Sequence, residues 1–222
     1  MGKRLLGVAV GTAVIGVLIG LYVSVWATQL PGAVTPPTKG AGATRSAHLT
    51  LETVAAVGPQ LSPQHPDWVS YLVRSHGRWI RSTIFKLPAH ALVHVTIYQF
   101  DGDSGLRNPF LSEVEGTVGG TMSIDGKPTR SIDPDTASHT FIVPQLGVFV
   151  PLQGVDDNAK NQCGYAPCLL SQAHNTITFT FRTGAKGRYR WQCFVPCAAG
   201  TFFGFGGAMQ TLGYMDGFLD VA

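Results

Sequence analysis

The sequence predicts an all-β sandwich preceded by one N-terminal transmembrane helix. Two observations favour the sandwich. Short segments alternate apolar and polar residues, and no stretch after the N-terminal apolar run keeps a helical period. The 27 glycines and 14 prolines of this 222-residue chain agree, because these residues punctuate short strands and turns. The helix is predicted by a third observation, a long uncharged run that begins near the N-terminus.

This apolar run extends from Leu5 to Ala27. As a helix it would be roughly 34 Å long, which is enough to cross the hydrocarbon core of a bilayer. Lys3 and Arg4 precede it, so the positive-inside rule places the N-terminus in the cytoplasm and the rest of the chain outside. A cleaved signal peptide is the alternative, but its apolar core is usually shorter. We expect an uncleaved, single-pass anchor in the cell membrane.

Glycines recur at a spacing of four along this segment, at Gly7 and Gly11 and again at Gly16 and Gly20. Such pairs allow two membrane helices to approach closely, which predicts a partner in a membrane complex. Glycine is also common in membrane helices generally, and this alternative stays open. The formal charge of +3, without a basic run, excludes nucleic acid as a partner.

The anchor region, residues 1–30, is followed by PGAVTPPTKGAGATRSA, residues 31–47. This segment is rich in Pro, Gly, Ala and Thr and shows no hydrophobic periodicity, which is typical of a linker. We therefore expect a tether between the membrane and an extracytoplasmic domain that comprises residues 48–222.

Several segments of that domain have the pattern of strands. HALVHVTIYQF and NTITFTFRT alternate strictly between apolar and polar residues. HTFIVPQLGVFVPL is apolar throughout and predicts a strand broken at Pro144, and RYRWQCF and GFLDV predict two more strands near the C-terminus. Short strands separated by turn residues, without helices, indicate a sandwich.

Two insertions separate these strands. Residues 101–135 are rich in Gly and Asp, and their Asp101 and Asp103 are explained by turn chemistry or by a cation-binding loop. The second insertion, DDNAKNQCGYAPC, contains Cys163 and Cys168. No histidine or acid is spaced around these cysteines as a zinc site would require, so a local disulfide is predicted.

The order of the remaining motifs resembles the cupredoxin domain of cytochrome c oxidase subunit II. The segments that carry the resemblance are DTASHTFIVPQLG and TFTFRTGAKGRYRWQCFVPCAAG, and the match extends over residues 90–221. The resemblance implies a cupredoxin-like Greek-key β-sandwich with a copper centre. It also implies that His139, Cys193 and Cys197 are copper ligands, since thiolates bridge and imidazoles terminate such a centre.

The chain departs from the family pattern after its second cysteine. The family has a histidine and then a methionine there, where this sequence has Thr201 and Gly204, and Val195 replaces a carboxylate between the cysteines. No histidine follows His174. We expect His174 and His94 to be structural, although either would complete a mononuclear site if it lay close in space.

Two interpretations follow. In one, His139, Cys193 and Cys197 bind copper, with Met209 as a displaced methionine ligand. In the other, Cys193 and Cys197 form a disulfide, as nearby thiols do outside the cytoplasm, and the copper site is lost.

The first interpretation predicts a copper-binding, electron-transfer or respiratory-oxidase-associated protein, with a redox protein as electron donor. The second predicts a copper-free accessory or interaction subunit of a membrane complex. If the protein is redox-active, we expect an electron-transfer subunit of an oxidase rather than a stand-alone enzyme. No hydrolase or nucleotide-binding motif is present in the sequence.

Overall fold

The computed structural model describes residues 2–22, 31–61, 66–197 and 207–222. These residues form two units, Met1–Leu30 and Pro31–Ala222. The first unit holds a single helix, α1 (Gly2–Tyr22), and the last part of the expected anchor, residues 23–27, lies outside the described residues. No helix in the described part of the chain combines the length and the apolarity that a bilayer crossing requires. The membrane anchor stays a prediction.

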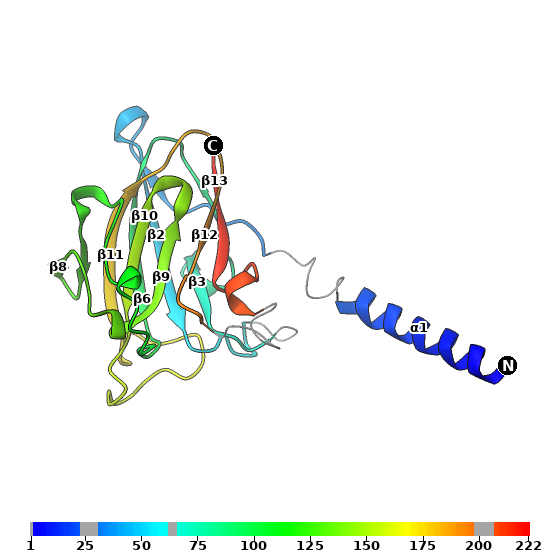
Figure 1. The fold of residues 1–222 in the computed structure, drawn as a ribbon. Coiled ribbons are helices and arrows are strands. Elements are labelled where there is room, and N and C mark those ends of the chain that lie inside the picture. Colours follow the sequence, from blue (N-terminus) through cyan, green and yellow to red (C-terminus); the bar gives the residue numbers. More distant parts are fainter. Residues whose placement is uncertain (1, 23–30, 62–65, 198–206) are drawn as a thin grey trace. The chain divides into compact units, whose positions relative to one another are not determined.

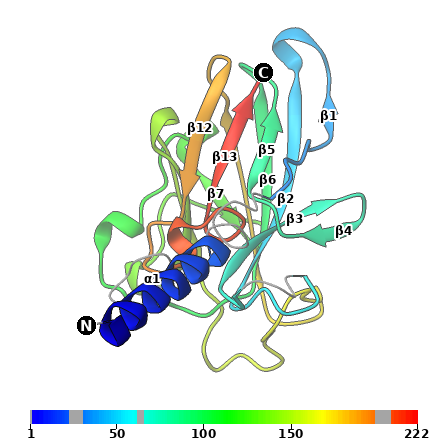
Figure 2. The same cartoon turned by 90° about the vertical axis from the view of Figure 1, so that its right-hand side faces the viewer.

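The second unit is a sandwich of two β-sheets, which confirms the predicted fold class (Figure 1; Figure 2). One sheet has eight strands in the order β4-β3-β2-β6-β11-β7-β8, with β1 paired to β2, and the other has five in the order β10-β9-β12-β13-β5. The strands of the first sheet are β1 (Thr38–Lys39), β2 (Ser46–Val54), β3 (Ser70–Ser75), β4 (Arg78–Ile80), β6 (Leu92–Gln99), β7 (Met122–Ile124), β8 (Lys127–Thr129) and β11 (Asn175–Arg182). Those of the second are β5 (Ile84–Leu87), β9 (Ala137–Val143), β10 (Val148–Gln153), β12 (Gly187–Gln192) and β13 (Asp216–Val221).

The strands predicted from strict alternation pair with each other. β6 and β11 are antiparallel, and their apolar residues meet in the register Val93↔Phe181, Val95↔Phe179 and Ile97↔Ile177. All six are buried. Because side chains alternate across a strand, one pleated face of this pair contributes to the core and the other carries His and Thr.

The apolar segment around Pro144 forms a hairpin of β9 and β10. A 3₁₀ turn, Pro144–Leu146, connects the two strands and ends at Gly147, whose φ of 63° is left-handed. Proline cannot donate a ladder hydrogen bond and glycine tolerates positive φ, so the predicted break occurs where these residues stand.

Trp191 of β12 lies at the centre of the core. Its ring is fully buried and stacks on Phe85 and Phe141, and Tyr71 packs edge-on against it. The indole Nε1 donates a 3.0 Å hydrogen bond to the Thr83 carbonyl oxygen. This bond satisfies the polar atom that burial of a tryptophan would otherwise leave unpaired.

The segment expected to be a linker packs into the sandwich over part of its length. Val34 is buried and forms a parallel bridge with Phe85, and its backbone exchanges 2.8 Å hydrogen bonds with Ile84 and Lys86. Further on, β1 pairs with the start of β2, so strand pairing begins before residue 48. The Pro- and Gly-rich composition excludes a helix there, but it does not exclude short edge pairing.

The insertion of residues 101–135 extends the first sheet. Its β7–β8 hairpin pairs with β11 through Ile124↔Ile177 and Thr178↔Ser123. Met122 and Leu111 of the insertion are buried against the core.

Candidate metal centre

Strands β9 and β12 place His139 and Cys193 at the same end of the sandwich. The two strands are paired at Gln192↔Ile142, so Cys193 continues opposite Phe141, two residues from His139. Cys193 also donates its backbone N–H to the Met215 carbonyl oxygen at 2.9 Å, which extends the pairing of β12 with β13. Two-residue periodicity puts His139 and Phe141 on one face of β9. Regular strand geometry therefore holds these two side chains.

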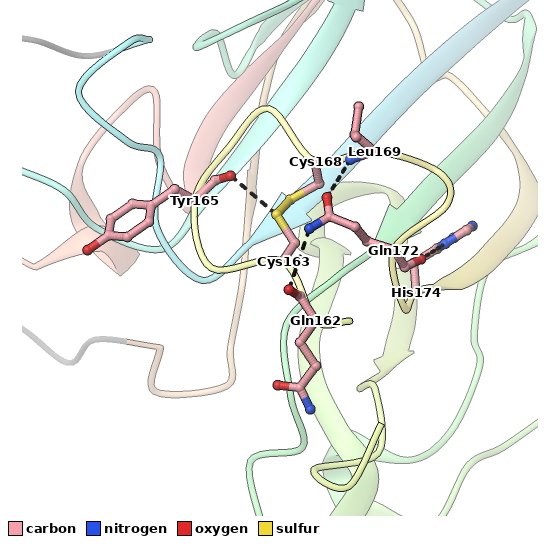
Figure 3. Close-up of a disulfide and its surroundings, with 7 residues drawn as sticks. All are labelled: Gln162, Cys163, Tyr165, Cys168, Leu169, Gln172 and His174. Atoms are coloured by element: carbon pink, nitrogen blue, oxygen red, sulfur yellow. Dashed lines mark hydrogen bonds between the residues drawn. A yellow bond between two sulfur atoms is a disulfide. The ribbon is translucent and has the colours of Figure 1, made fainter. Parts of the chain in front are cut away.

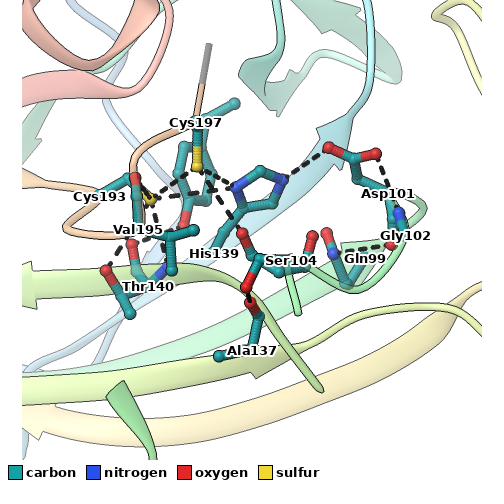
Figure 4. A network of polar contacts seen from close by, with 12 residues as sticks. Gln99, Asp101, Gly102, Ser104, Ala137, His139, Thr140, Cys193, Val195 and Cys197 are labelled. Carbon is teal, nitrogen blue, oxygen red and sulfur yellow. Dashed lines mark hydrogen bonds and ion pairs between the residues drawn. The ribbon is translucent and has the colours of Figure 1, made fainter. Parts of the chain in front are cut away.

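Cys197 reaches the same place through a tight turn. Its backbone N–H donates to the Val195 carbonyl oxygen at 2.6 Å, and the Phe194 N–H donates to Thr140 Oγ1 at 2.7 Å. These bonds fold residues 193–197 back over the end of β9, so both thiols face one imidazole (Figure 4).

The three donor atoms form one compact cluster. Nδ1 of His139 lies 2.7 Å from the Cys197 sulfur and 3.9 Å from the Cys193 sulfur, and the two sulfurs are 3.2 Å apart. All three donors lie within 4.8 Å of one another. His139 is 2% exposed, Cys193 0% and Cys197 8%, and both cysteines are free thiols. The sequence-predicted histidine and cysteines are thus brought together.

Asp101 orients the imidazole and was not predicted to do so. Its Oδ2 lies 3.0 Å from His139 Nε2, while its Oδ1 accepts a 2.9 Å hydrogen bond from the Gly102 N–H. The turn chemistry expected from the sequence is therefore present, but the second oxygen serves the histidine. A carboxylate on the outer nitrogen of a histidine ligand fixes its ring orientation and directs the other nitrogen inward.

The electrostatics of the cluster favour one thiolate beside an imidazolium. Burial acts to lower the pKa of His139, but hydrogen bonds to Asp101 and Cys193 raise that pKa to about 9. Burial acts to raise the pKa of Cys193, but hydrogen bonds with Cys197 and His139 bring it well below its usual range. Burial and the neighbouring Cys193 raise the pKa of the Cys197 thiol. A metal ion bound here would displace protons from Cys197 and from His139.

The donor set fits a soft or borderline metal ion, because thiolates and imidazole select copper and zinc over harder cations. Two thiolates on one tetrahedral ion would lie roughly 3.8 Å apart, and a thiolate and an imidazole nitrogen roughly 3.6 Å. The observed 3.2 Å between the sulfurs and 2.7 Å between Cys197 and His139 are shorter. Binding therefore needs Cys197 to move outward by about 1 Å.

The two remaining candidate histidines do not join the cluster, and a ligand role for Met209 stays a prediction. Met209 is half-buried in a 3₁₀ turn, and its carbonyl oxygen accepts from Gln192 Nε2 at 2.6 Å. Its side chain makes no polar contact with the cluster among the described residues. His94 bonds to Thr180 Oγ1 and stacks on His48, so it has the structural role expected.

His174 also has a structural role, because its Nδ1 hydrogen-bonds to the Gln172 carbonyl oxygen and its ring packs against Phe100. Val195 contributes its backbone carbonyl oxygen, 3.5 Å from the Cys193 sulfur. Thr201 and Gly204, at the positions of the missing family ligands, lie outside the described residues.

The predicted disulfide between Cys163 and Cys168 is confirmed (Figure 3). The disulfide closes a short loop. The side-chain amide of Gln172 holds this loop in place, because its oxygen accepts a 2.7 Å hydrogen bond from the Leu169 N–H and its nitrogen donates one of 3.4 Å to the Gln162 carbonyl oxygen.

No protein-family model and no curated protein matches the chain. Solved structures of rusticyanin do align with it. Rusticyanin from Thiobacillus ferrooxidans is 16% identical over 92% of this chain and 92% of its own, with a TM-score of 0.35. Reduced rusticyanin is 17% identical over 92% and 95%, with a TM-score of 0.31. Another of these structures is described as that of a copper protein. Similarity at this level carries no conclusion about family or function.

Proposed function

We propose that this chain is a cupredoxin-like protein that binds copper through His139, Cys193 and Cys197 and transfers electrons. The observation that carries the proposal is the convergence of one imidazole and two thiol groups within 4.8 Å in a buried cluster. His139 and the two cysteines come from segments more than fifty residues apart in sequence, and Asp101 orients the imidazole at the point where they meet.

Bound copper would supply one-electron chemistry. The protein residues would hold and shield it. Cys193 and Cys197 would provide thiolates, His139 would provide Nδ1, and Asp101 would hold the imidazole in place from the other side. The buried position of all three donors limits the contact of the site with water, and solvent access is one of the factors that set a redox potential.

The wider setting of this activity rests on the sequence alone. The resemblance to cytochrome c oxidase subunit II suggests a respiratory membrane complex as the partner and a redox protein as the donor. The apolar N-terminal segment suggests attachment to the cell membrane with the sandwich outside the cytoplasm.

A second candidate function is a copper-free accessory subunit in which Cys193 and Cys197 form a disulfide. The observation that favours it is the 3.2 Å distance between the sulfurs, which a movement of about 1 Å would shorten to a covalent bond. The same chain contains an oxidised pair, Cys163 and Cys168, as extracytoplasmic proteins do.

Metal analysis combined with a thiol count distinguishes the two functions. The protein would be purified without reductant from cells supplied with copper. We expect stoichiometric copper and visible thiolate-to-copper absorption, both lost in Cys193→Ser. The matched control is the double variant Cys163→Ser/Cys168→Ser, which also removes two sulfurs but leaves the cluster intact and should keep its copper. Absence of copper together with absence of free thiols would establish the accessory function instead.

A further inference from the structure

The two thiols of the centre differ in their access to the surface. The Cys193 side chain is fully buried, and its sulfur lies against the Thr140 N–H at 3.4 Å and the Val195 carbonyl oxygen at 3.5 Å. Cys197 is 8% exposed and lines a cavity of about 530 Å³ together with His139, whereas Cys193 is not among the lining residues. Among the described residues, the cluster thus borders a cavity at Cys197 and His139 and is enclosed at Cys193.

The cavity has walls that suit a cation. Asp67, Asp101 and Asp103 line it, and none of its described lining residues is a lysine or an arginine. The cationic group among these residues is His139, which Asp101 pairs with. Negative groups that line a concave surface raise the local concentration of cations and steer them inward. The cavity therefore leads a positive ion toward the side of the cluster at Cys197 and His139.

The cluster leaves one coordination position for an outside ligand. A tetrahedral ion takes four ligands, and the His and Cys side chains described at the cluster offer three. The described lining residues of the cavity add no further sulfur or imidazole, and the sequence from 198 to 208 contains no His, Cys or Met. The cavity borders the cluster at Cys197 and His139, so an outside ligand would approach the ion from there.

We propose that Cu(I) enters and leaves this centre through the cavity, with Cys197 as the exchanging ligand and Cys193 as the retained one. The inference rests on the proposed copper-binding function. The incoming ion is carried by a small soft-ligand complex, whose ligand occupies the open position before it departs. Copper stays Cu(I) throughout, the carrier leaves in its free form, and the protons displaced from Cys197 and His139 pass to the solvent.

The test measures the rate of copper transfer from the small, cationic acetonitrile complex of Cu(I) to the full-length, reduced protein without oxygen. Leu106 lines the cavity, and the variant Leu106→Trp narrows it with a larger side chain. We expect transfer at least about tenfold slower with an unchanged final extent of transfer, because a narrowed route changes the rate and not the equilibrium. Leu169→Trp, at an exposed position outside the cavity, is the matched control and should behave as the unmodified protein.

A transfer rate in Leu106→Trp equal to that of the control would overturn the route while leaving the copper-binding function intact. Failure of the unmodified protein to take up copper at all would overturn both the route and the copper-binding function.

A second measurement needs neither copper nor a substitution. With iodoacetamide and peptide mass spectrometry, we expect Cys197 to be alkylated well before Cys193, since the fully buried Cys193 is closed to the reagent although its lower pKa favours the reactive thiolate. Alkylation of Cys193 first, or of both at one rate, would contradict the assignment.

Discussion

Glu52 is a buried carboxyl group whose substitution should stabilise the protein. It lies in β2, in register with Leu72 of β3 and Tyr98 of β6, and it is fully buried. Neither of its carboxyl oxygens has a hydrogen-bond partner among the described residues. Burial raises the pKa of Glu52 to about 8, and the smaller opposing effects of the nearby Cys168 backbone and the Arg74 charge do not reverse the shift.

The size and sign of the effect follow from proton linkage. The folded chain keeps the Glu52 proton up to about pH 8, while the unfolded chain loses it near the ordinary pKa of 4.5. Between these values the folded state binds more protons, so the free energy of unfolding falls as pH rises, by about 1.4 kcal/mol per unit. At pH 7 the loss amounts to roughly 3 kcal/mol. Glu52→Gln cannot ionise and should avoid this loss.

The measurement is urea unfolding followed by tryptophan fluorescence at several values from about pH 5 to about pH 8. We expect Glu52→Gln to be more stable than the unmodified protein by up to roughly 3 kcal/mol near pH 7, and the difference to shrink toward pH 5. Glu113→Gln, at an exposed position, is the matched control and should leave the pH dependence unchanged. Parallel pH profiles for the unmodified protein and Glu52→Gln would refute the reasoning.

Three further predictions concern the centre, the disulfide and the anchor. Asp101→Asn should weaken Cu(I) affinity by about 10- to 100-fold in a chelator competition, because His139 loses its orienting carboxylate, and Asp103→Asn should leave the affinity unchanged. Cys163→Ser/Cys168→Ser should lower the free energy of unfolding by about 2 kcal/mol in urea titrations, as expected for so short a loop, and an unchanged midpoint would contradict this. Deletion of the first thirty residues should move the protein from the membrane fraction to the soluble fraction of a cell lysate; a full-length chain already found in the soluble fraction would exclude the anchor.

Strands were predictable from the sequence where only one of their faces is buried. β6 and β11 keep strict alternation because their second face carries polar residues. β9 shows no alternation, since all seven of its residues are buried, and only its proline and glycine mark its end. β2 alternates as far as Leu51 and is then buried on both faces at Glu52 and Thr53, which removes the period-two signal from its second half.

The metal-ligand candidates His139, Cys193 and Cys197 were predictable because they lie in two contiguous motifs. The residue that orients His139, Asp101, was not predictable in this way. Asp101 follows β6 of one sheet and His139 lies in β9 of the other, so their contact exists only because the two sheets pack together. In the sequence, Asp101 precedes a glycine, and this turn pattern explains the residue fully on its own. Met209 was predicted as a ligand because the family has a methionine ligand after its second cysteine. Among the described residues, no polar contact joins its side chain to the cluster, and its role stays a prediction.

The chemistry of the centre depends on Cys197 more than on its other members. Asp101 fixes His139 from behind, and the pairing of Cys193 with β13 fixes the first thiol. Cys197 is held by the turn at Val195 and by the cluster itself. Its sulfur would have to move about 1 Å toward Cys193 to form a disulfide, or about 1 Å away from His139 to admit a metal ion. The two proposed functions thus require different displacements of the same Cys197 side chain.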